Sequence, residues 1–270
     1  DIWVPSTDTV PPEKSKQLTF SLHTNIADGI LELSLESYYK VMSDLITYKE
    51  GVSFFDGNNW ENSIAQSGQG EAYGLEFLLK KSKGKSTGWI SYTLSWSNRK
   101  FDDVNFGDWY PYKYDRRHDF SFVYNHKIND KIDFSVTWVY CSGNAVSFPQ
   151  ATYWGMDVPF YAVSNFTNPN TYNAYASPAG YVDQGSLNHV ETLGYYGNRN
   201  STRMSPYHRL DFGINFHKKR KYFNRTISFS IYNIYNRKNP FFIYLDIDQS
   251  EARQVSLFPI IPTLTYSFSF

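Results

Sequence analysis

The chain has 270 residues, 26 basic and 26 acidic side chains, and therefore no formal net charge. This balance excludes nucleic acid as the main partner, and a single cysteine, Cys141, excludes a disulfide framework and a thiolate metal site. Aromatic residues make up 19% of the chain although the mean hydropathy is −0.50. That combination is typical of a β-barrel with a lipid-facing surface, a wet lumen and aromatic girdles.

Nine segments of the chain alternate apolar and polar residues with the period of two that is typical of β-strands. In chain order the predicted strands lie near 17–24, 29–48, 71–81, 87–98, 116–127, 131–142, 206–218, 225–245 and 253–270. Most are longer than the ~5–6 residues common in soluble sheets and suit the ~9–11 residues that cross a bilayer at a tilt. Their polar rows include carboxylates such as Glu32, Glu36, Asp133 and Asp211, which a water-filled lumen accommodates and a dry core does not.

The connections between the predicted strands alternate between short and long. The short ones lie near 25–28, 82–86, 129–130 and 219–224, and the long ones near 49–70, 99–115, 143–205 and 246–252. Outer-membrane barrels have short periplasmic turns and long extracellular loops. An odd strand count places the two termini on opposite sides of the membrane, so we expect this chain to be part of a larger barrel. Strands 17–24 and 253–270 should then be open edges that pair with strands outside this numbering.

Three stretches between Gly68 and Ser121 carry a family resemblance: GQGEAYGLEFLLKK, GWISYTLSWSNRKF and YPYKYDRRHDFS. Together with ISFSIYNIYNRKNPFF at 227–242 and the closing VSLFPIIPTLTYSFSF, they resemble the C-terminal barrel of TonB-dependent outer-membrane receptors. The similarity is strongest to the subgroup with an N-terminal carboxypeptidase-regulatory-like domain. It implies an all-β fold, a transmembrane antiparallel β-barrel in which about nine strands form the C-terminal part of a 22-stranded barrel.

The same resemblance implies how the chain is organised and what it contacts. Residues 1–270 would be the C-terminal part of the barrel, without the plug and the N-terminal strands, and 143–205 a long extracellular loop. The location would be the outer membrane of a Gram-negative bacterium. Partners would be the remainder of the barrel and the plug, TonB through the absent N-terminal region, outer-membrane lipid and, as an alternative role of the long loop, a surface lipoprotein. The alternating aromatics Tyr266, Phe268 and Phe270 would be an assembly signal.

We predict that the protein is not an enzyme, with no catalytic residue, metal or cofactor. Its six histidines show no HExxH or paired metal spacing, and there is no GxSxG, P-loop or GxGxxG. The charged run from Asp115 to Asp119 is interpreted as a structural ion-pair network.

The predicted function is active import of a scarce nutrient, namely an iron chelate, cobalamin, a peptide or a glycan, energised by TonB. Loop 143–205 is unusually long and mixes tyrosine and tryptophan with asparagine and glycine, which is typical of adaptable recognition surfaces. The candidate ligand-binding residues are Tyr153, Trp154, Tyr161, Tyr172, Tyr175 and, from loop 99–115, Trp109. The alternatives are a passive porin-like or structural outer-membrane barrel, and a soluble all-β carbohydrate-binding module.

Overall fold

A computed structural model describes residues 4–49, 60–156, 190–219, 223–246 and 251–270. The chain divides into two compact units: unit 1 comprises 1–147, 198–244 and 253–270, and unit 2 comprises 148–197 and 245–252. In the described residues, no helix is long and apolar enough to span a membrane.

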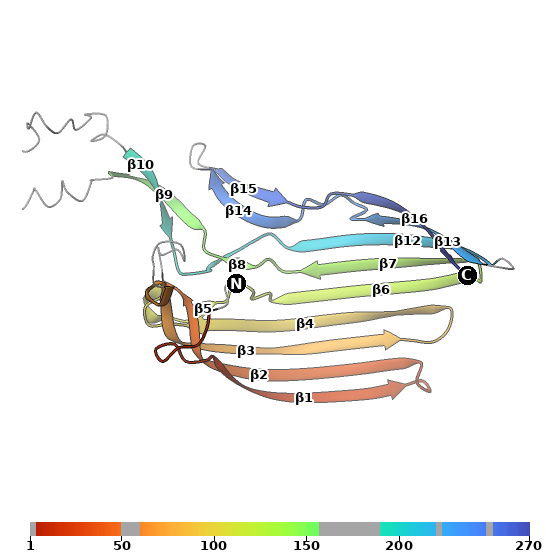
Figure 1. The fold of residues 1–270 in the computed structure, drawn as a ribbon, viewed down its shortest axis with the longest axis horizontal. Helices are drawn as coiled ribbons and strands as arrows, with labels where there is room; N and C mark the ends of the chain where they lie inside the picture. The colour runs from red at the N-terminus through yellow and green to blue at the C-terminus, as the bar shows by residue number, and fades with distance from the viewer. Residues whose placement is uncertain (1–3, 50–59, 157–189, 220–222, 247–250) are drawn as a thin grey trace, which may run out of the picture. The chain divides into compact units, whose positions relative to one another are not determined.

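Nine long antiparallel strands of unit 1 lie side by side in a single path, and we call this sheet the wall (Figure 1). In order across the wall the strands are β1 (Lys14–Ile26), β2 (Leu31–Tyr48), β3 (Ile64–Lys81), β4 (Ser86–Lys100), β6 (His118–Asn129), β7 (Ile132–Cys141), β12 (Tyr207–Lys219), β13 (Asn224–Tyr232) and β16 (Ile261–Ser269). Neighbouring strands of the wall pair antiparallel, and their order across the wall is their order along the chain. The predicted all-β architecture with about nine strands is therefore confirmed.

The register of the wall gathers the apolar rows on one face. Leu18 pairs with Tyr39, Tyr39 with Tyr73, and Tyr73 with Trp96, so one apolar row crosses four strands. The opposite face carries polar rows, of which one runs through Ser21, Glu36, Glu76, Thr93 and Asp119. Because side chains alternate between faces along a strand, one in-register set of hairpins extends this division over the whole wall.

The two edge strands, β1 and β16, each pair on one side only in the part of the chain that the structure describes. Their apolar side chains are correspondingly open, with Phe20 and Leu264 both 74% exposed. The prediction that the nine strands do not close on one another is confirmed. Which strands meet these edges stays a prediction.

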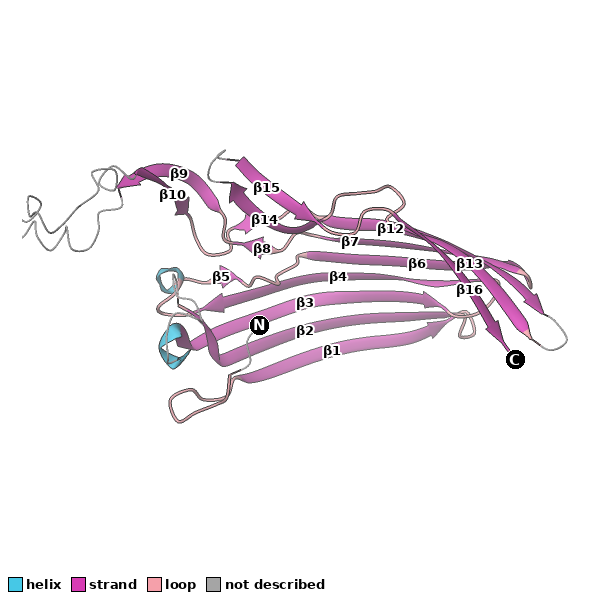
Figure 2. Cartoon of the chain, turned by 45° about the horizontal axis from the view of Figure 1, so that its top comes forward, coloured by secondary structure: helices cyan, strands magenta, loops and turns pink. Residues whose placement is uncertain are grey.

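The wall has a short-turn end and a long-loop end, as Figure 2 shows. Residues 27–30, 82–85, 130–131 and 220–223 connect strands at the short-turn end, and 49–63, 101–117, 142–206 and 233–260 at the long-loop end. The predicted alternation of short and long connections is confirmed. β16 runs toward the short-turn end, and β1 starts at the long-loop end.

The predictions of continuous strands over 225–245 and 253–270 are wrong. β13 ends at Tyr232, and a separate hairpin of β14 (Pro240–Asp246) and β15 (Glu251–Ser256) precedes β16. The break occurs because Asn233 and Asn236 adopt left-handed backbone conformations, at φ 55° and 51°. The buried Asn233 accepts a hydrogen bond from the Arg237 N–H (3.0 Å) and donates its own N–H to Asp211 (2.8 Å). Asparagine tolerates this conformation better than most residues do.

The prediction that β3 begins near 71 is also wrong, because this strand begins at Ile64. Its first residues pack in a buried group that we call the long-loop cluster, formed by Leu45, Ala65, Phe101, Val104 and Tyr110. Gly68 hides this part of the strand from pattern analysis, since it interrupts the alternation. A Cβ at Gly68 would collide with the Phe101 ring, so the glycine is what allows the ring to lie against β3.

The predicted loop 143–205 contains short strands at both of its ends. β8 (Ala145–Val146) pairs with β11 (Thr202–Arg203) in unit 1, and β9 (Pro149–Met156) pairs with β10 (Val190–Tyr196) in unit 2. The loop over 101–117 includes the 3₁₀ turn η2 (Asn105–Gly107) and β5 (Tyr110–Pro111), which pairs with β4. Another 3₁₀ turn, η1 (Trp60–Ser63), precedes β3.

Candidate functional site

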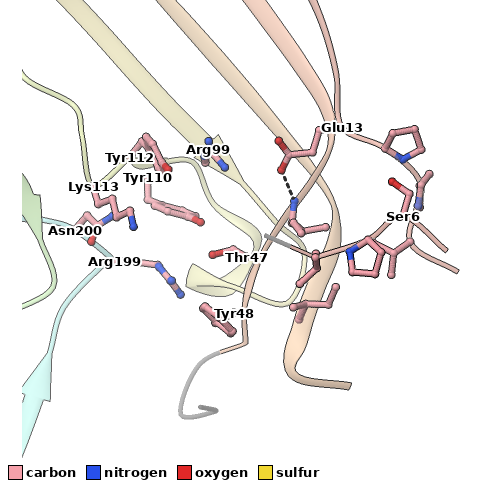
Figure 3. Close-up of a pocket in the computed structure, with 17 residues that line it drawn as sticks. Ser6, Glu13, Thr47, Tyr48, Arg99, Tyr110, Tyr112, Lys113, Arg199 and Asn200 are labelled. Carbon is pink, nitrogen blue, oxygen red and sulfur yellow. Dashed lines mark hydrogen bonds between the residues drawn. The ribbon is translucent and has the colours of Figure 1, made fainter. Parts of the chain in front are cut away.

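A cavity of about 790 Å³ lies at the long-loop end of unit 1, and we call it the long-loop cavity (Figure 3). The residues that line it come from the N-terminal segment, the end of β2, the start of β3, the end of β4 and the β5 region. Two more, Arg199 and Asn200, lie shortly before β11 in the chain. The residues that matter for its chemistry are Glu13, Tyr48, Arg99, Tyr110, Tyr112, Lys113, Arg199 and Asn200. Its size falls within the range of small-molecule sites, roughly 300–1,000 Å³.

The N-terminal segment that lines the cavity is held to Glu61 by hydrogen bonds from two of its threonines. The hydroxyl groups of Thr7 and Thr9 each donate to a carboxylate oxygen of Glu61 at 2.9 Å. Val10, which lines the cavity, is buried. Glu13 accepts a hydrogen bond from the Ile46 N–H at 3.3 Å, which joins the segment to β2.

Arg99 is positioned by the end of β4. Strand alternation places it on the polar face of the wall, where its guanidinium carbon lies 3.8 Å from the centre of the Tyr112 ring. A guanidinium that stacks on a tyrosine ring keeps its charge. Its N–H groups point outward in the guanidinium plane and can still donate to a ligand. Its Nε atom is buried and has no hydrogen-bond partner in the part of the chain that the structure describes.

Arg199 and Asn200 are positioned by backbone and amide hydrogen bonds from the loop over 101–117. The Arg199 N–H donates to the Asn105 side-chain oxygen at 2.7 Å, and the Asn200 amide donates to the Pro111 carbonyl at 2.9 Å. The Arg199 guanidinium lies 5.5 Å from the Tyr110 ring. Two loops that are far apart in sequence therefore line one side of the cavity together.

A buried ion pair holds together the loops that line this side of the cavity. Asp115 is buried, accepts a hydrogen bond from the Ser97 N–H at 2.7 Å, and contacts the guanidinium groups of Arg203 and Arg117. It thus joins β4, the loop over 101–117 and β11. The interpretation of the charged run around Asp115 as a structural ion-pair network is confirmed for this residue.

Basic side chains outnumber acidic ones among the described residues that line the cavity. Arg99, Lys113 and Arg199 are basic, and Glu13 is acidic. In Figure 3 the three basic side chains lie on the same side of the view as Tyr110 and Tyr112. Among the described residues, no group of histidine, cysteine and acidic side chains is arranged to hold a metal ion.

The ligand-binding residues predicted from the sequence are not among the described residues that line the cavity. Trp109 is exposed and precedes the cavity residue Tyr110, without lining the cavity itself. Tyr153 and Trp154 are in β9 of unit 2. Tyr161, Tyr172 and Tyr175 lie outside the described residues. The role of these six residues stays a prediction.

Sequence reasoning missed Arg99, Lys113 and Arg199 as site residues. Arg99 lies near the end of a strand, where alternation predicts a polar residue whether or not it has a function. Arg199 lies in a loop that is far from Arg99 in the sequence. The YPYKYD segment around Tyr112 did carry a signal, because it places a cation, Lys113, between two tyrosines. Tyr110 in the same segment is buried in the long-loop cluster.

Several solved structures share the fold of this chain. The ferripyoverdine receptor of the outer membrane of Pseudomonas aeruginosa is similar with a TM-score of 0.53 and 12% identity, over 96% of this chain and 27% of its own. The ferric-catecholate import receptor Fiu from Escherichia coli gives a TM-score of 0.54 and 12% identity, over 98% and 30%. The FrpB iron transporter from Neisseria meningitidis gives 0.55 and 11%, over 97% and 32%.

The chain therefore has the fold of the barrel of TonB-dependent outer-membrane receptors, and it spans less than a third of the length of these three proteins. Their sequences are too distant for more than the fold to follow from the similarity. No protein-family model and no curated protein matches the sequence.

Proposed function

We propose that this chain is the C-terminal part of an active importer in the outer membrane of a Gram-negative bacterium, energised by TonB. The observation that carries the proposal is the wall: nine antiparallel strands with one continuous apolar face, one polar face and all long connections at one end. A lipid environment is the surrounding in which such an apolar face is stable without a protein layer over it. The long-loop end then faces the outside of the cell.

The two open edges define the first partner. Unpaired backbone groups at the edge of a strand cost several kcal/mol each in lipid, so β1 and β16 require further strands. In this proposal they come from the remainder of a 22-stranded barrel. The plug would occupy the polar face, and TonB would act through the N-terminal region of the complete protein.

The cargo is a scarce nutrient that is too large or too dilute for porins. Two of the structural neighbours are described as receptors for ferripyoverdine or ferric catecholates, which favours an iron chelate. Cobalamin, a peptide and a glycan remain the other candidates. Capture takes place at the long-loop end, with Trp109, Tyr153, Trp154, Tyr161, Tyr172 and Tyr175 as proposed contacts from the loops.

The test is an uptake assay on the complete protein in a strain that lacks its other importers. Accumulation of the nutrient should stop when the proton-motive force is dissipated and when TonB is deleted. A passive porin-like barrel would instead give accumulation that is independent of both, and that result would overturn the proposal.

A deletion of residues 150–200 then tests the role of the long loop. Ligand binding should weaken while barrel assembly is retained, because the deletion removes the loop beyond the wall strands. Binding assays with and without candidate surface lipoproteins distinguish direct ligand capture from docking of such a partner. Unchanged binding and uptake would show that the loop serves only packing.

A further inference from the structure

We infer that a pocket on the apolar face of the wall, near the short-turn end, binds an anionic phospholipid. The inference rests on the proposed function, because it takes the apolar face of the wall to lie in lipid. It goes beyond that function by assigning a lipid site to the barrel surface. We call the pocket the notch, and the residues that define it are Leu79, Lys81, Gly88, Ile90, Phe122 and Tyr124.

A missing side chain in the register of the wall creates the notch. Across β3, β4 and β6, which lie side by side in Figure 1, Lys81 pairs with Gly88 and Gly88 pairs with Tyr124. These positions belong to the apolar face, because they fall in the same alternating rows as Tyr73 and Trp96. Glycine adds no side chain to its row, so a pocket of about 150 Å³ remains between Lys81 and Tyr124.

The backbone of β4 requires this glycine. The φ of Gly88 is 151°, and a Cβ at this position would collide with the carbonyl oxygen of Val123 on β6. That oxygen belongs to the backbone of a paired strand, so it cannot move aside as the end of a flexible side chain could. The notch is therefore a consequence of how closely β4 approaches β6.

The side of the notch toward the middle of the wall is apolar. The next row of the register holds Leu79, Ile90 and Phe122, and all three line the notch. The rings of Phe122 and Tyr124 are nearly parallel, with 6° between their planes and 6.4 Å between their centroids, and they form a flat surface along β6. An apolar cavity of about this volume can hold a hydrocarbon as large as benzene, so a segment of an acyl chain fits.

The side of the notch toward the turns is polar. Ser86 lines the notch, and its Oγ lies 3.1 Å from the Tyr124 hydroxyl and 2.7 Å from Nδ1 of His126. The three side chains form one hydrogen-bonded group at the end of β4 and β6. The notch thus changes from hydrocarbon to polar groups along the direction of the strands, as a lipid does from its chains to its headgroup.

A cation lies at the polar end of the notch. The Lys81 ammonium bends toward the turn between β3 and β4, because its Nζ lies 4.0 Å from the place where a Cβ on Gly84 would be. Lys83 and Lys85 are exposed in the same turn, which contains no acidic residue. Lys83 donates a hydrogen bond to the Asp28 carbonyl oxygen at 3.4 Å and keeps its charge.

An anionic phospholipid matches both ends of the notch. With an acyl chain against Leu79, Ile90 and Phe122, its headgroup lies at the level of Lys81, whose ammonium can donate to the phosphate. The lysines of the turn favour a headgroup with a net negative charge over a zwitterionic one. The proposed orientation of the barrel places this lipid in the leaflet on the periplasmic side.

The test measures lipid binding to the complete receptor, purified in a nonionic detergent and freed of lipid. The two probes have the same acyl chains: phosphatidylglycerol, which is anionic, and phosphatidylcholine, which is zwitterionic. Native mass spectrometry over a titration gives the Kd of each, and we expect phosphatidylglycerol to bind about tenfold more tightly. Phosphatidylglycerol with a photoreactive acyl chain should then label the peptides of β3, β4 and β6 that form the notch.

Two variants with matched controls test the two ends of the notch. Lys81→Gln should raise the Kd of phosphatidylglycerol about tenfold. Its control is Lys80→Gln, because Lys80 projects to the opposite face, where it pairs with Glu32 at 3.1 Å. Leu79→Trp should fill the notch and weaken binding of both lipids there. Its control is Leu75→Trp on the same strand and face, since Leu75 is exposed and is not among the described residues that line the notch.

Folding of each variant is checked by its heat-dependent migration on gels. If a variant fails to fold, the two lipids and the labelling pattern on the unmodified receptor decide the inference. Equal Kd values for the two lipids, label spread evenly over the apolar face, or a Kd that Lys81→Gln leaves unchanged would each overturn it. Uptake in cells is scored separately. TonB-dependent uptake without lipid selectivity overturns the notch and leaves the importer, whereas selective lipid binding with uptake independent of TonB supports the notch and overturns the importer.

Discussion

The wall leaves apolar side chains exposed, whereas the long-loop cluster buries them. On the wall, Leu18, Phe20 and Leu75 are 77%, 74% and 57% exposed, and no protein layer covers them in the described residues. In the cluster, Phe101 and Val104 are 1% and 0% exposed and pack against protein. The same chain covers one apolar surface with its own loops and leaves the other without protein cover, where the proposed function places lipid.

The largest effect should come from emptying the cluster. We expect Phe101→Ala to destabilise the long-loop end by about 3–5 kcal/mol, because it leaves a cavity in a packed core against Gly68. Phe229→Ala, on the apolar face of the wall, should cost clearly less because lipid fills the space that it leaves. Hydrogen exchange of the amides over 101–110 measures the difference. Equal losses at both sites would remove the distinction between the two regions.

A charge on the wall should discriminate its two faces. Leu75→Arg places a cation on the apolar face and should cost about 2–4 kcal/mol near the bilayer centre, whereas Glu76→Arg, one residue later, places it on the polar face and should cost far less. The measurement is the folded fraction of the complete protein in phospholipid vesicles over a urea series. Equal sensitivity at both positions would contradict the assignment of the apolar face to lipid.

Removing the charge of Asp115 should weaken the long-loop end without affecting the wall. Asp115→Asn keeps an acceptor for the Ser97 N–H but leaves Arg203 and Arg117 without their counter-charge, which should cost about 1.5–3 kcal/mol. Faster proteolysis of the loops over 101–117 and 198–206, with unchanged migration of the barrel, is the expected result. Asp103→Asn, an exposed acid in the same loop, is the control.

The smallest effect on stability should come from Phe270, whose side chain is 99% exposed. Phe270→Asp should change the unfolding free energy by no more than ~0.5 kcal/mol, as for other surface substitutions. The amount of folded barrel at the cell surface should nevertheless fall, because we expect Phe270, which directly follows β16, to serve assembly. Surface labelling in cells, compared with urea unfolding of the refolded variant, separates the two effects; normal surface levels would count against an assembly role.

The period of two was sufficient to predict the wall because neither face of a strand depends on distant sequence for its polarity. Rows such as Leu18, Tyr39, Tyr73 and Trp96 are each visible within their own segment, and hairpin connections set their register. The prediction was wrong where a local conformation interrupted a strand: Asn233 and Asn236 end β13 within a segment whose composition favours a strand.

The sequence alone determined the all-β class, the apolar and polar faces and the sorting of short and long connections, because these follow from alternation and spacing along the chain. Only the tertiary structure decided the long-loop cluster and the long-loop cavity. Arg99 and Arg199 are a hundred residues apart, and what brings them to one cavity is a set of specific contacts: Asn105 on the Arg199 backbone, Pro111 on Asn200 and Asp115 on Arg203. Such contacts depend on how loops fold back on one another, and no periodic pattern records them.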